Sequence, residues 1–191
     1  MPRPKEFDPD VVLDRAVALF WEQGYEKTSM QELVERMGIH KRSMYDTFGD
    51  KRALYLKALD RYADTVERSK REAAEQEVDT RLALRGLFES AVADVGQHPA
   101  GCLSVNCATE LALHDPDAAA RVAKAFAREQ QLVLDLVRRG QDAGEIASRH
   151  DARSLAMSLF NAWVGLRVRV RTGLPHAQLR QMVEGMMTML A

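Results

Sequence analysis

The sequence predicts an all-α protein built from nine helices. Apolar residues recur three and four positions apart along most of the chain, which is the spacing of one helical face. Glycine and proline are sparse, at 11 and 6 of 191 residues, and they fall between these apolar stretches. Alanine, leucine, arginine, glutamate and methionine are abundant, which favours helix. One segment, Val168–Arg171, alternates like a strand, but because no partner strand exists we expect it to be helical.

The composition excludes several classes of protein. With 46% hydrophobic and 29% charged residues, the chain can form a packed core and is not expected to be disordered. Its net charge of −1 argues against a uniformly basic nucleic-acid-binding surface, although a local basic patch is compatible with that total. No apolar run is long enough to span a bilayer, and no apolar signal-peptide segment follows the N-terminus. We therefore expect a cytoplasmic protein without a membrane partner.

The first helix is expected to begin at Pro9. Asp8 before it is a helix-capping residue, and proline is favoured at the first helical position. The short arm that precedes it carries Arg3 and Lys5, which could reach into a minor groove or be solvated. Gly24 ends the helix. Its apolar face consists of Leu13, Ala16, Val17 and Phe20.

Two short helices follow. Ser29 and Glu32 form a capping box, in which each side chain binds the other's free N–H group. An apolar stripe continues to Gly38, which ends the second helix. After a tight turn the third helix covers residues 41–48, and Asp50 caps the helix after it.

The fourth helix is expected to run from about Lys51 to about Glu75. Its far end, residues 67–77, is almost entirely charged and is interpreted as a solvated face. Caps and breaks, among them Gly96, divide the rest of the chain into five more helices. We expect these at about 79–95, 101–113, 116–141, 151–172 and 176–190.

The first three helices, with a tight turn between the second and third, have the geometry of a helix-turn-helix. The third helix can then lie in the major groove of DNA while the second crosses the backbone. Free N–H groups at the start of the second helix favour a phosphate, and polar or basic side chains open the third helix where base edges are within reach. The expected DNA contacts are Thr28, Ser29, His40, Lys41, Arg42, Ser43, Tyr45 and Lys51.

Two of these residues have simpler interpretations. Tyr45 could be a packing residue. Lys51 could be an ordinary residue of a first helical turn, although a cation there is unfavourable for the helix dipole.

Three linked segments resemble the TetR family of regulators over about residues 8–60. The segment ALFWEQGYEKTSM, residues 18–30, looks like the family's first helix and turn. The segment MGIHKRSMY, residues 37–45, resembles its recognition segment, and FGDKRALY, residues 48–55, resembles the start of its fourth helix. Because the three segments match in order, spacing and chemistry, the resemblance is specific.

The resemblance implies a nine-helix homodimer that binds a palindromic operator in double-stranded DNA, in most members as a repressor. The helix-turn-helix domain would cover residues 1–50, with the fourth helix as connector, and a sensing and dimerisation domain would cover 51–191. Two departures leave the base preference open. His40 stands where the family has a small Ser or Thr cap, and Asp46 adds a negative charge to the recognition helix.

In the second half, the resemblance implies architecture and little chemistry. The last two helices would form the dimer face, because a final helix is unstable unless it is packed. Their apolar stripes could equally be intramolecular core. The stripes are Leu155, Leu159, Ala162, Leu166 and Val170, followed by Leu179, Met182, Val183, Met186, Met187 and Leu190.

A small-molecule effector of unknown identity would bind among the middle helices. Asn106 and Glu110 are the best indications, because they are polar residues one turn apart on an otherwise apolar helix and buried polar groups need partners. Each expected contact could instead be core. The expected ligand contacts are Phe88, Val92, Cys102, Leu103, Asn106, Glu110, Phe126 and Trp163.

Cys102 offers an alternative trigger. It would lie near a helix N-terminus, where a thiolate is favoured, and some family members with a similar Gly-Cys-Leu start to this helix sense electrophiles or oxidants. Cys107 lies ~7.5 Å further along the helix and ~140° around it, which exceeds disulfide reach. Both cysteines could be plain core, and a soft-metal site with His98 and His114 would match no standard spacing.

Two other classes of protein fit the sequence less well. An enzyme using either cysteine with a histidine lacks an oriented third group, a phosphate loop or paired carboxylates. An architectural DNA-packaging protein would be strongly basic, whereas this chain is near neutral. We therefore expect no catalytic activity, no cofactor and no metal site.

Overall fold

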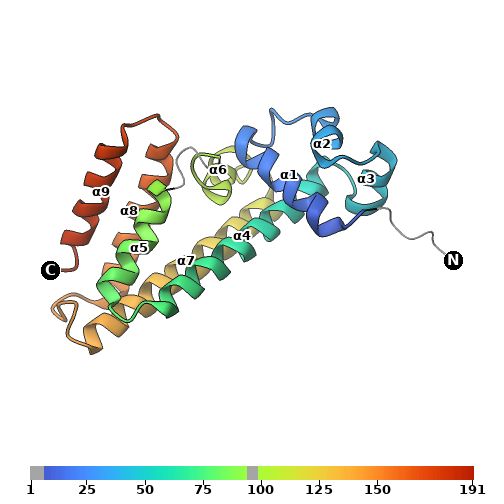
Figure 1. Ribbon diagram of the computed structural model, residues 1–191. Helices are drawn as coiled ribbons and strands as arrows, with labels where there is room; N and C mark the ends of the chain where they lie inside the picture. Colours follow the sequence, from blue (N-terminus) through green and yellow to red (C-terminus); the bar gives the residue numbers. More distant parts are fainter. Residues whose placement is uncertain (1–6, 94–98) are drawn as a thin grey trace.

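The computed structural model describes residues 7–93 and 99–191, and these form nine α-helices and no strand (Figure 1). The predicted all-α fold is confirmed, and so is the helical state of the alternating segment, because α8 continues through Val170. The helices are α1 (Pro9–Gln23), α2 (Met30–Met37), α3 (Lys41–Phe48), α4 (Lys51–Gln76), α5 (Thr80–Ala93), α6 (Leu103–Glu110), α7 (Pro116–Asp142), α8 (Ala152–Val170) and α9 (His176–Thr188).

Three of the later helices, α6, α8 and α9, are shorter than the sequence predicts, whereas α7 covers its predicted range and reaches Asp142. The clearest case is α6, which ends at Glu110 and not near residue 113. The amides of Leu111 and Ala112 both donate to the Cys107 carbonyl, at 3.0 Å each, so the regular helical ladder stops there. The N-terminal arm with Arg3 and Lys5, the break at Gly96, and His98 lie outside the described residues.

Polar caps start the early helices as predicted. The Asp8 carboxylate accepts from the Asp10 amide at 2.9 Å. In the capping box, the Ser29 amide donates to Glu32 at 2.8 Å and the Glu32 amide donates to the Ser29 hydroxyl at 3.2 Å. The Asp50 carboxylate accepts from the Ala53 amide at 2.7 Å. Local sequence therefore sets where α1, α2 and α4 begin.

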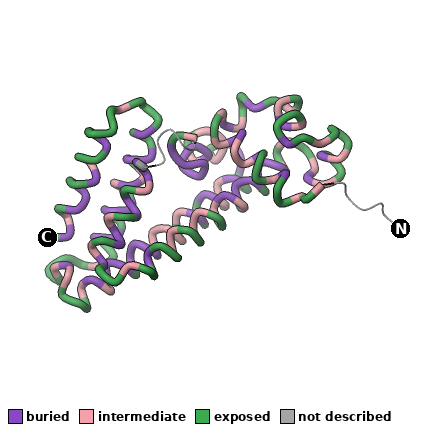
Figure 2. The backbone as a smooth tube through the Cα atoms, viewed as in Figure 1, coloured by how far each residue is buried: buried purple, intermediate pink, exposed green. Residues whose placement is uncertain are grey.

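The head of the molecule consists of α1, α2, α3 and the first half of α4. Its helices bury residues between them (Figure 2), and nearly all of these residues are apolar. Phe20 meets Tyr55 edge to face, with ring centroids 4.8 Å apart, and so joins α1 to α4. Because α4 forms one wall of this core and then continues out of it, the head is built on a helix that it shares with the rest of the chain.

The two longest helices, α4 and α7, lie side by side and run in the same direction away from the head (Figure 1). Salt bridges cross between them in the same order along both helices. These are Asp60 with Arg121 at 2.9 Å, Asp64 with Arg128 at 2.7 Å, and Lys70 with Glu129 at 3.0 Å.

The charged far end of α4 is solvated on one side, where Arg68, Glu72 and Glu75 are exposed as the sequence suggests, but its other side is covered. The Lys70 side chain keeps only 9% of its exposure, Glu67 pairs with Arg128 at 3.1 Å, and Ala74 is buried. The reason is that α7 and α5 cover this face. A charge pattern read along one helix does not contain that information.

The body of the molecule is completed by α5, α8 and α9 (Figure 1). The apolar stripes of α8 and α9 that were expected to form a dimer face are mostly buried inside this one chain, so the structure supports their alternative interpretation as core. On α8, Met157 and Val168 are exposed instead, at 48% and 45%. None of the described helices is both long and apolar enough to cross a membrane.

A pair of glycine substitutions tests this architecture. Gly38 ends α2 with φ 69°, and an L-residue there is strained, so Gly38→Ala should lower the free energy of unfolding by about 1–2 kcal/mol. Gly86 is helical and its Cβ would meet nothing within 4 Å, so Gly86→Ala should raise it by up to about 1 kcal/mol. Urea unfolding measures both. Equal effects of the two substitutions would contradict the turn after α2.

Candidate functional site

The recognition helix expected from the sequence, α3, presents a polar face to solvent. His40, Lys41, Arg42 and Tyr45 are exposed and Ser43 is partly buried. The opposite face holds the helix in place, because Met44 and Phe48 are buried in the head. The structure therefore brings five of the predicted DNA contacts onto one surface.

The start of α2 is capped from within the chain. The Ser29 hydroxyl accepts from the Glu32 amide, and the Ser29 hydroxyl and amide together hold the pKa of the Glu32 carboxyl below its ordinary value. Ser29 is exposed, so this capped helix start remains accessible from solvent.

The side chain of Thr28 is not available for the DNA contact that the sequence predicts. It is fully buried, and its hydroxyl donates to the Gly24 carbonyl at 2.6 Å. The hydroxyl is needed inside the α1–α2 turn, which leaves its side chain no surface for a DNA contact.

Two of the expected contacts have partners within the chain. The Lys51 amine lies 4.3 Å from the centre of the Tyr25 ring, a cation–π contact that offsets the unfavourable helix dipole at this position. Arg42 faces Asp46 at 3.7 Å, but with 94% of its side chain exposed it is free to turn outward. Asp46 therefore lies on the exposed face beside Arg42, where it lowers the local positive charge.

Glu110, expected as a ligand contact, instead joins the head to the body. Its carboxylate accepts from the Tyr25 amide at 3.0 Å and from the Glu26 amide at 2.9 Å, just after α1 ends. A Cβ at Gly24 would lie 2.8 Å from this carboxylate, so Gly24 makes the approach sterically feasible. The sequence signal was a polar residue on an apolar helix, and its partner proved to be backbone.

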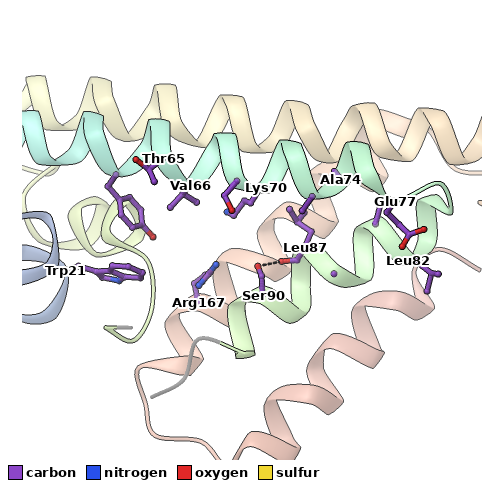
Figure 3. A pocket seen from close by; sticks show the side chains of 15 residues that line it. Trp21, Thr65, Val66, Lys70, Ala74, Glu77, Leu82, Leu87, Ser90 and Arg167 are labelled. Atoms are coloured by element: carbon purple, nitrogen blue, oxygen red, sulfur yellow. Dashed lines mark hydrogen bonds between the residues drawn. The ribbon is translucent and has the colours of Figure 1, made fainter. Parts of the chain in front are cut away.

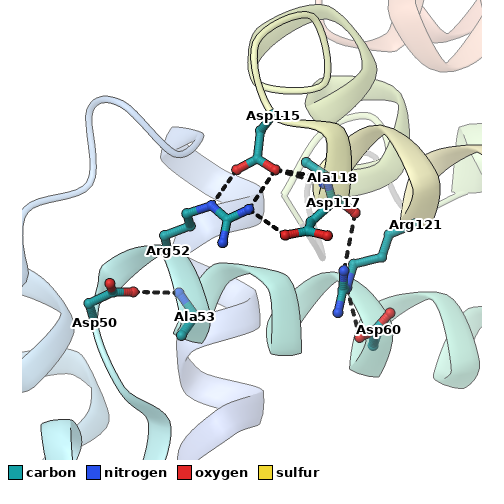
Figure 4. Close-up of polar contacts among 8 residues, drawn as sticks. All are labelled: Asp50, Arg52, Ala53, Asp60, Asp115, Asp117, Ala118 and Arg121. Carbon is teal, nitrogen blue, oxygen red and sulfur yellow. Dashed lines mark hydrogen bonds and ion pairs between the residues drawn. The ribbon is translucent and has the colours of Figure 1, made fainter.

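A second joint links the start of α4 to the start of α7 (Figure 4). Arg52 donates to both oxygens of Asp115, at 2.6 and 2.9 Å, and to Asp117 at 2.6 Å. Asp115 also caps α7 by accepting from the Asp117 and Ala118 amides. The Arg52 pair, with these amides, lowers the pKa of the Asp115 carboxyl to about 2. The joint therefore stays ionised at neutral pH.

A cleft of about 490 Å³ lies between α4 and α5 (Figure 3). Trp21 of α1 and Arg167 of α8 line one end, and Glu77 and Leu82 line the other. Its volume falls within the range of small-molecule pockets, about 300–1,000 Å³. It is the structure's best candidate for a ligand site because it contacts the head through α1 and the body through α5 and α8.

The residues expected to bind a ligand do not line this cleft. Phe126 is half-buried against Phe160, at 5.6 Å between ring centroids. Asn106 and Glu110 lie on a second cleft, between α6 and the end of α1. The other expected ligand contacts are buried in the hydrophobic core: Phe88, Val92, Cys102, Leu103 and Trp163.

Sequence reasoning missed a pair of buried cations at the cleft. Lys70 and Arg167 both lie over the Trp163 ring, at 4.0 and 5.0 Å from its centre. Burial lowers the pKa of Lys70 and the nearby Arg167 lowers it further, while Glu129 opposes both effects. A usable signal existed, because Arg167 falls four residues after Trp163 on the buried face of α8.

The two cysteines are both buried and lie against tyrosines of α4. Cys102 caps α6 without a side-chain hydrogen bond to its backbone and faces Tyr62, whose pKa is raised by burial and by this thiol. Cys107 faces Tyr55, and burial raises the pKa of the Cys107 thiol to about 11. Among the described residues, no group of three or more histidine, cysteine or acidic side chains could hold a metal.

Comparison with known proteins matches two segments of the chain to family models. Residues 12–58 match the model of bacterial regulatory proteins of the tetR family, and residues 80–186 match the model of the tetracyclin repressor-like C-terminal domain. The chain is 35% identical over 152 residues to YezE of Bacillus subtilis, an uncharacterized HTH-type transcriptional regulator, covering 76% of each protein. It is 33% identical over 186 residues to the HTH-type transcriptional repressor ComR of Escherichia coli, covering 94% of this chain and 87% of ComR.

A solved structure shares the whole fold. A cysteine mutant of CifR, a TetR family transcriptional regulator, superimposes with a TM-score of 0.85 and 28% identity, covering 99% of this chain and 100% of CifR. That CifR structure is a complex with 26 bp double-strand operator DNA.

Acid should weaken the joint between α4 and α7. The pKa of Asp115 is about 2 in the folded chain and about 3.9 in an unfolded one, so the joint contributes stability above pH ~4 that is lost as the pH falls toward 2. Asp115→Asn should therefore be less stable than the native chain at pH 6, by a difference that shrinks between pH 4 and pH 2. Urea unfolding at several pH values measures it. A difference that stays constant with pH would show that this ion pair does not contribute.

Proposed function

The chain belongs to the TetR family of bacterial regulatory proteins and is a DNA-binding transcriptional regulator; we propose that it is a repressor, which binds a palindromic operator as a homodimer and leaves it when a small effector binds. The observation that carries this proposal is the exposed polar face of α3, held on the head by Met44 and Phe48. The operator complex of CifR and the repressor name of ComR support it.

In this proposal, α3 lies in the major groove. Lys41 and Arg42 at its first turn reach base edges or nearby phosphates, and Tyr45, 44% exposed, donates its hydroxyl to a phosphate. The remaining contacts from the surface of the head are Ser29, His40, Ser43 and Lys51. Residues 1–50 then form the DNA-binding domain, with α4 as connector to the sensing domain 51–191.

A second copy of the chain would pack on the outward faces of α8 and α9. The inward stripes are already used by the core, which leaves exposed apolar residues such as Met157 and Val168 for a partner. A dimer of this kind holds two recognition helices about one DNA turn apart, ~34 Å, as a palindromic site requires.

The cleft between α4 and α5 gives the proposed effector a route to the head. A ligand that binds better to another spacing of these helices shifts the population toward that spacing. Since α4 is part of the head and Arg52 at its start is tied to α7, a displaced α4 moves the recognition helix. Glu110 adds a second link through its bonds to the Tyr25 and Glu26 amides.

Charge reversal on α3 tests the DNA-binding surface. We expect Lys41→Glu and Arg42→Glu each to lower operator affinity at least about tenfold, because each replaces an exposed cation that contacts DNA. Fluorescence anisotropy with the flanking intergenic DNA, at fixed salt, measures the effect.

The matched control is Arg68→Glu, which makes the same charge change at an exposed position on α4 beyond the head. It should leave affinity within about twofold, since distant exposed charges are screened. Unchanged binding by both α3 variants would place the recognition helix elsewhere.

We also propose a second trigger for release, namely covalent modification of Cys102. This thiol lies at the N-terminus of α6 and beside Tyr62, Lys70 and Arg167, which line the cleft. An electrophile with an activated carbon–carbon double bond, such as a maleimide, would enter the cleft and add to the sulfur. The S–C bond forms as the double bond is lost, and the thiol proton ends on the neighbouring carbon. The added group would then press on α4.

Cysteine variants separate this trigger from simple ligand binding. N-ethylmaleimide should release operator DNA from the native chain and from Cys107→Ser, but not from Cys102→Ser. Cys107 should react slowly, because with a pKa of about 11 only roughly one thiol in three thousand is ionised at pH 7.5. Release of the Cys102→Ser variant at the native rate would remove Cys102 from the mechanism.

A further inference from the structure

The cleft between α4 and α5 has a cationic end. The guanidinium of Arg167 is turned toward the α4 wall, close to Lys70 (Figure 3). Arg167 is only 5% exposed, and one of its terminal nitrogens donates to the Gly101 carbonyl at 3.3 Å. Its Nε, on the other edge of the guanidinium, is buried and has no hydrogen-bond partner within residues 7–93 and 99–191. A buried charged donor left unpaired is unfavourable, which indicates that an acceptor belongs there.

The charges at this end do not balance. Lys70 is neutralised by Glu129 at 3.0 Å. The Arg167 guanidinium is a cation, and no carboxylate of the described chain forms an ion pair with it. Within the described residues, the site therefore carries one excess positive charge, which the Gly101 carbonyl and the face of Trp163 partly offset.

The rest of the cleft is mainly apolar. From Lys70 the α4 wall continues over Ala73 and Ala74, and the α5 wall opposite is formed by Ala83 and Leu87. The distance along α4 from Lys70 to Glu77 is about 10 Å, which suits a medium-length hydrocarbon chain. Glu77 at the far end disfavours a second anionic group there.

From these observations we infer that the cleft binds a small amphipathic monocarboxylate, with its carboxylate on Arg167 and its hydrocarbon tail between α4 and α5. The Nε edge of an arginine pairs with a carboxylate through two parallel hydrogen bonds, which would satisfy the orphaned donor and the excess charge together. The inference rests on the proposed function, because it names the chemical class of the effector for that site. A monoanion matches one excess charge, whereas a phosphate would bring a second.

The test compares three ligands with the same tail and different heads. Isothermal titration calorimetry with the native full-length chain would use octanoate, octanol and octylammonium. Octanoate should bind at least about tenfold more tightly than octanol, the range expected for a buried charge-assisted pair, and octylammonium should bind most weakly. Equal affinity for octanoate and octanol, or no heat from octanoate at millimolar concentration, would overturn the inference.

Variants locate the head and the tail independently. Arg167→Met should lower octanoate affinity at least about tenfold and abolish the preference over octanol, while Arg169→Met, an exposed arginine two residues further along α8, should change neither. Gly86 lines the cleft, and its Cβ position is free of contacts, so Gly86→Leu should fill the tail site without disturbing the fold. If Arg167→Met does not fold, Gly86→Leu still tests where the tail binds. Loss of octanoate binding in a Gly86→Leu variant of native thermal stability would place the tail in this cleft, whereas full octanoate binding by Gly86→Leu would contradict that placement.

Operator release is tested separately from the carboxylate site. Operator binding is measured by anisotropy. Octanoate binding without operator release would leave the carboxylate site intact and refute the effector role proposed above, whereas operator release without saturable octanoate binding would overturn the carboxylate site.

Discussion

The parallel pairing of α4 and α7 is the constraint on which the rest of the structure depends. α4 supplies a wall of the head, a wall of the cleft and one side of the salt bridges to α7. Exposed ion pairs contribute little one at a time, but here they lie in register along two long helices and end in a nearly buried pair, Lys70 with Glu129. The two helices are therefore expected to move together, and whatever moves α4 within the body also moves the head.

Two polar joints then limit how the head can move. Glu110 binds two backbone amides after α1, and Arg52 binds Asp115 and Asp117 at the start of α7. Each joint consists of two or more hydrogen bonds, so a small displacement of the head weakens several hydrogen bonds at once. Contacts of this kind favour a few discrete arrangements over continuous bending, which is the property that a switch between binding and non-binding states needs.

The sequence predicted those features that depend on neighbours along the chain. Helix starts at Asp8, Ser29 and Asp50 were predictable because a capping side chain acts within three residues of itself. The surface of α3 followed from its apolar spacing. The lining of the cleft was not predictable in this way, since Trp21 of α1 and Arg167 of α8 line the same cleft only when helices far apart in the sequence have packed. A single helical stripe does not say which of its residues border an opening. Glu110 shows the same limit: its polarity was visible, but not its partner on α1.

The shared direction of α4 and α7 also has an electrical consequence. Antiparallel helices cancel each other's dipoles, whereas these two add, with both positive ends at the head and both negative ends in the body. Side chains of opposite charge lie at these helix ends. Asp50 and Asp115 cap the positive ends, while Arg139 donates to the Ala74 and Glu77 carbonyls where α4 finishes. Asp50 and Asp115, two acidic residues near the head, thus face helix starts whose partial positive charge offsets part of their negative charge.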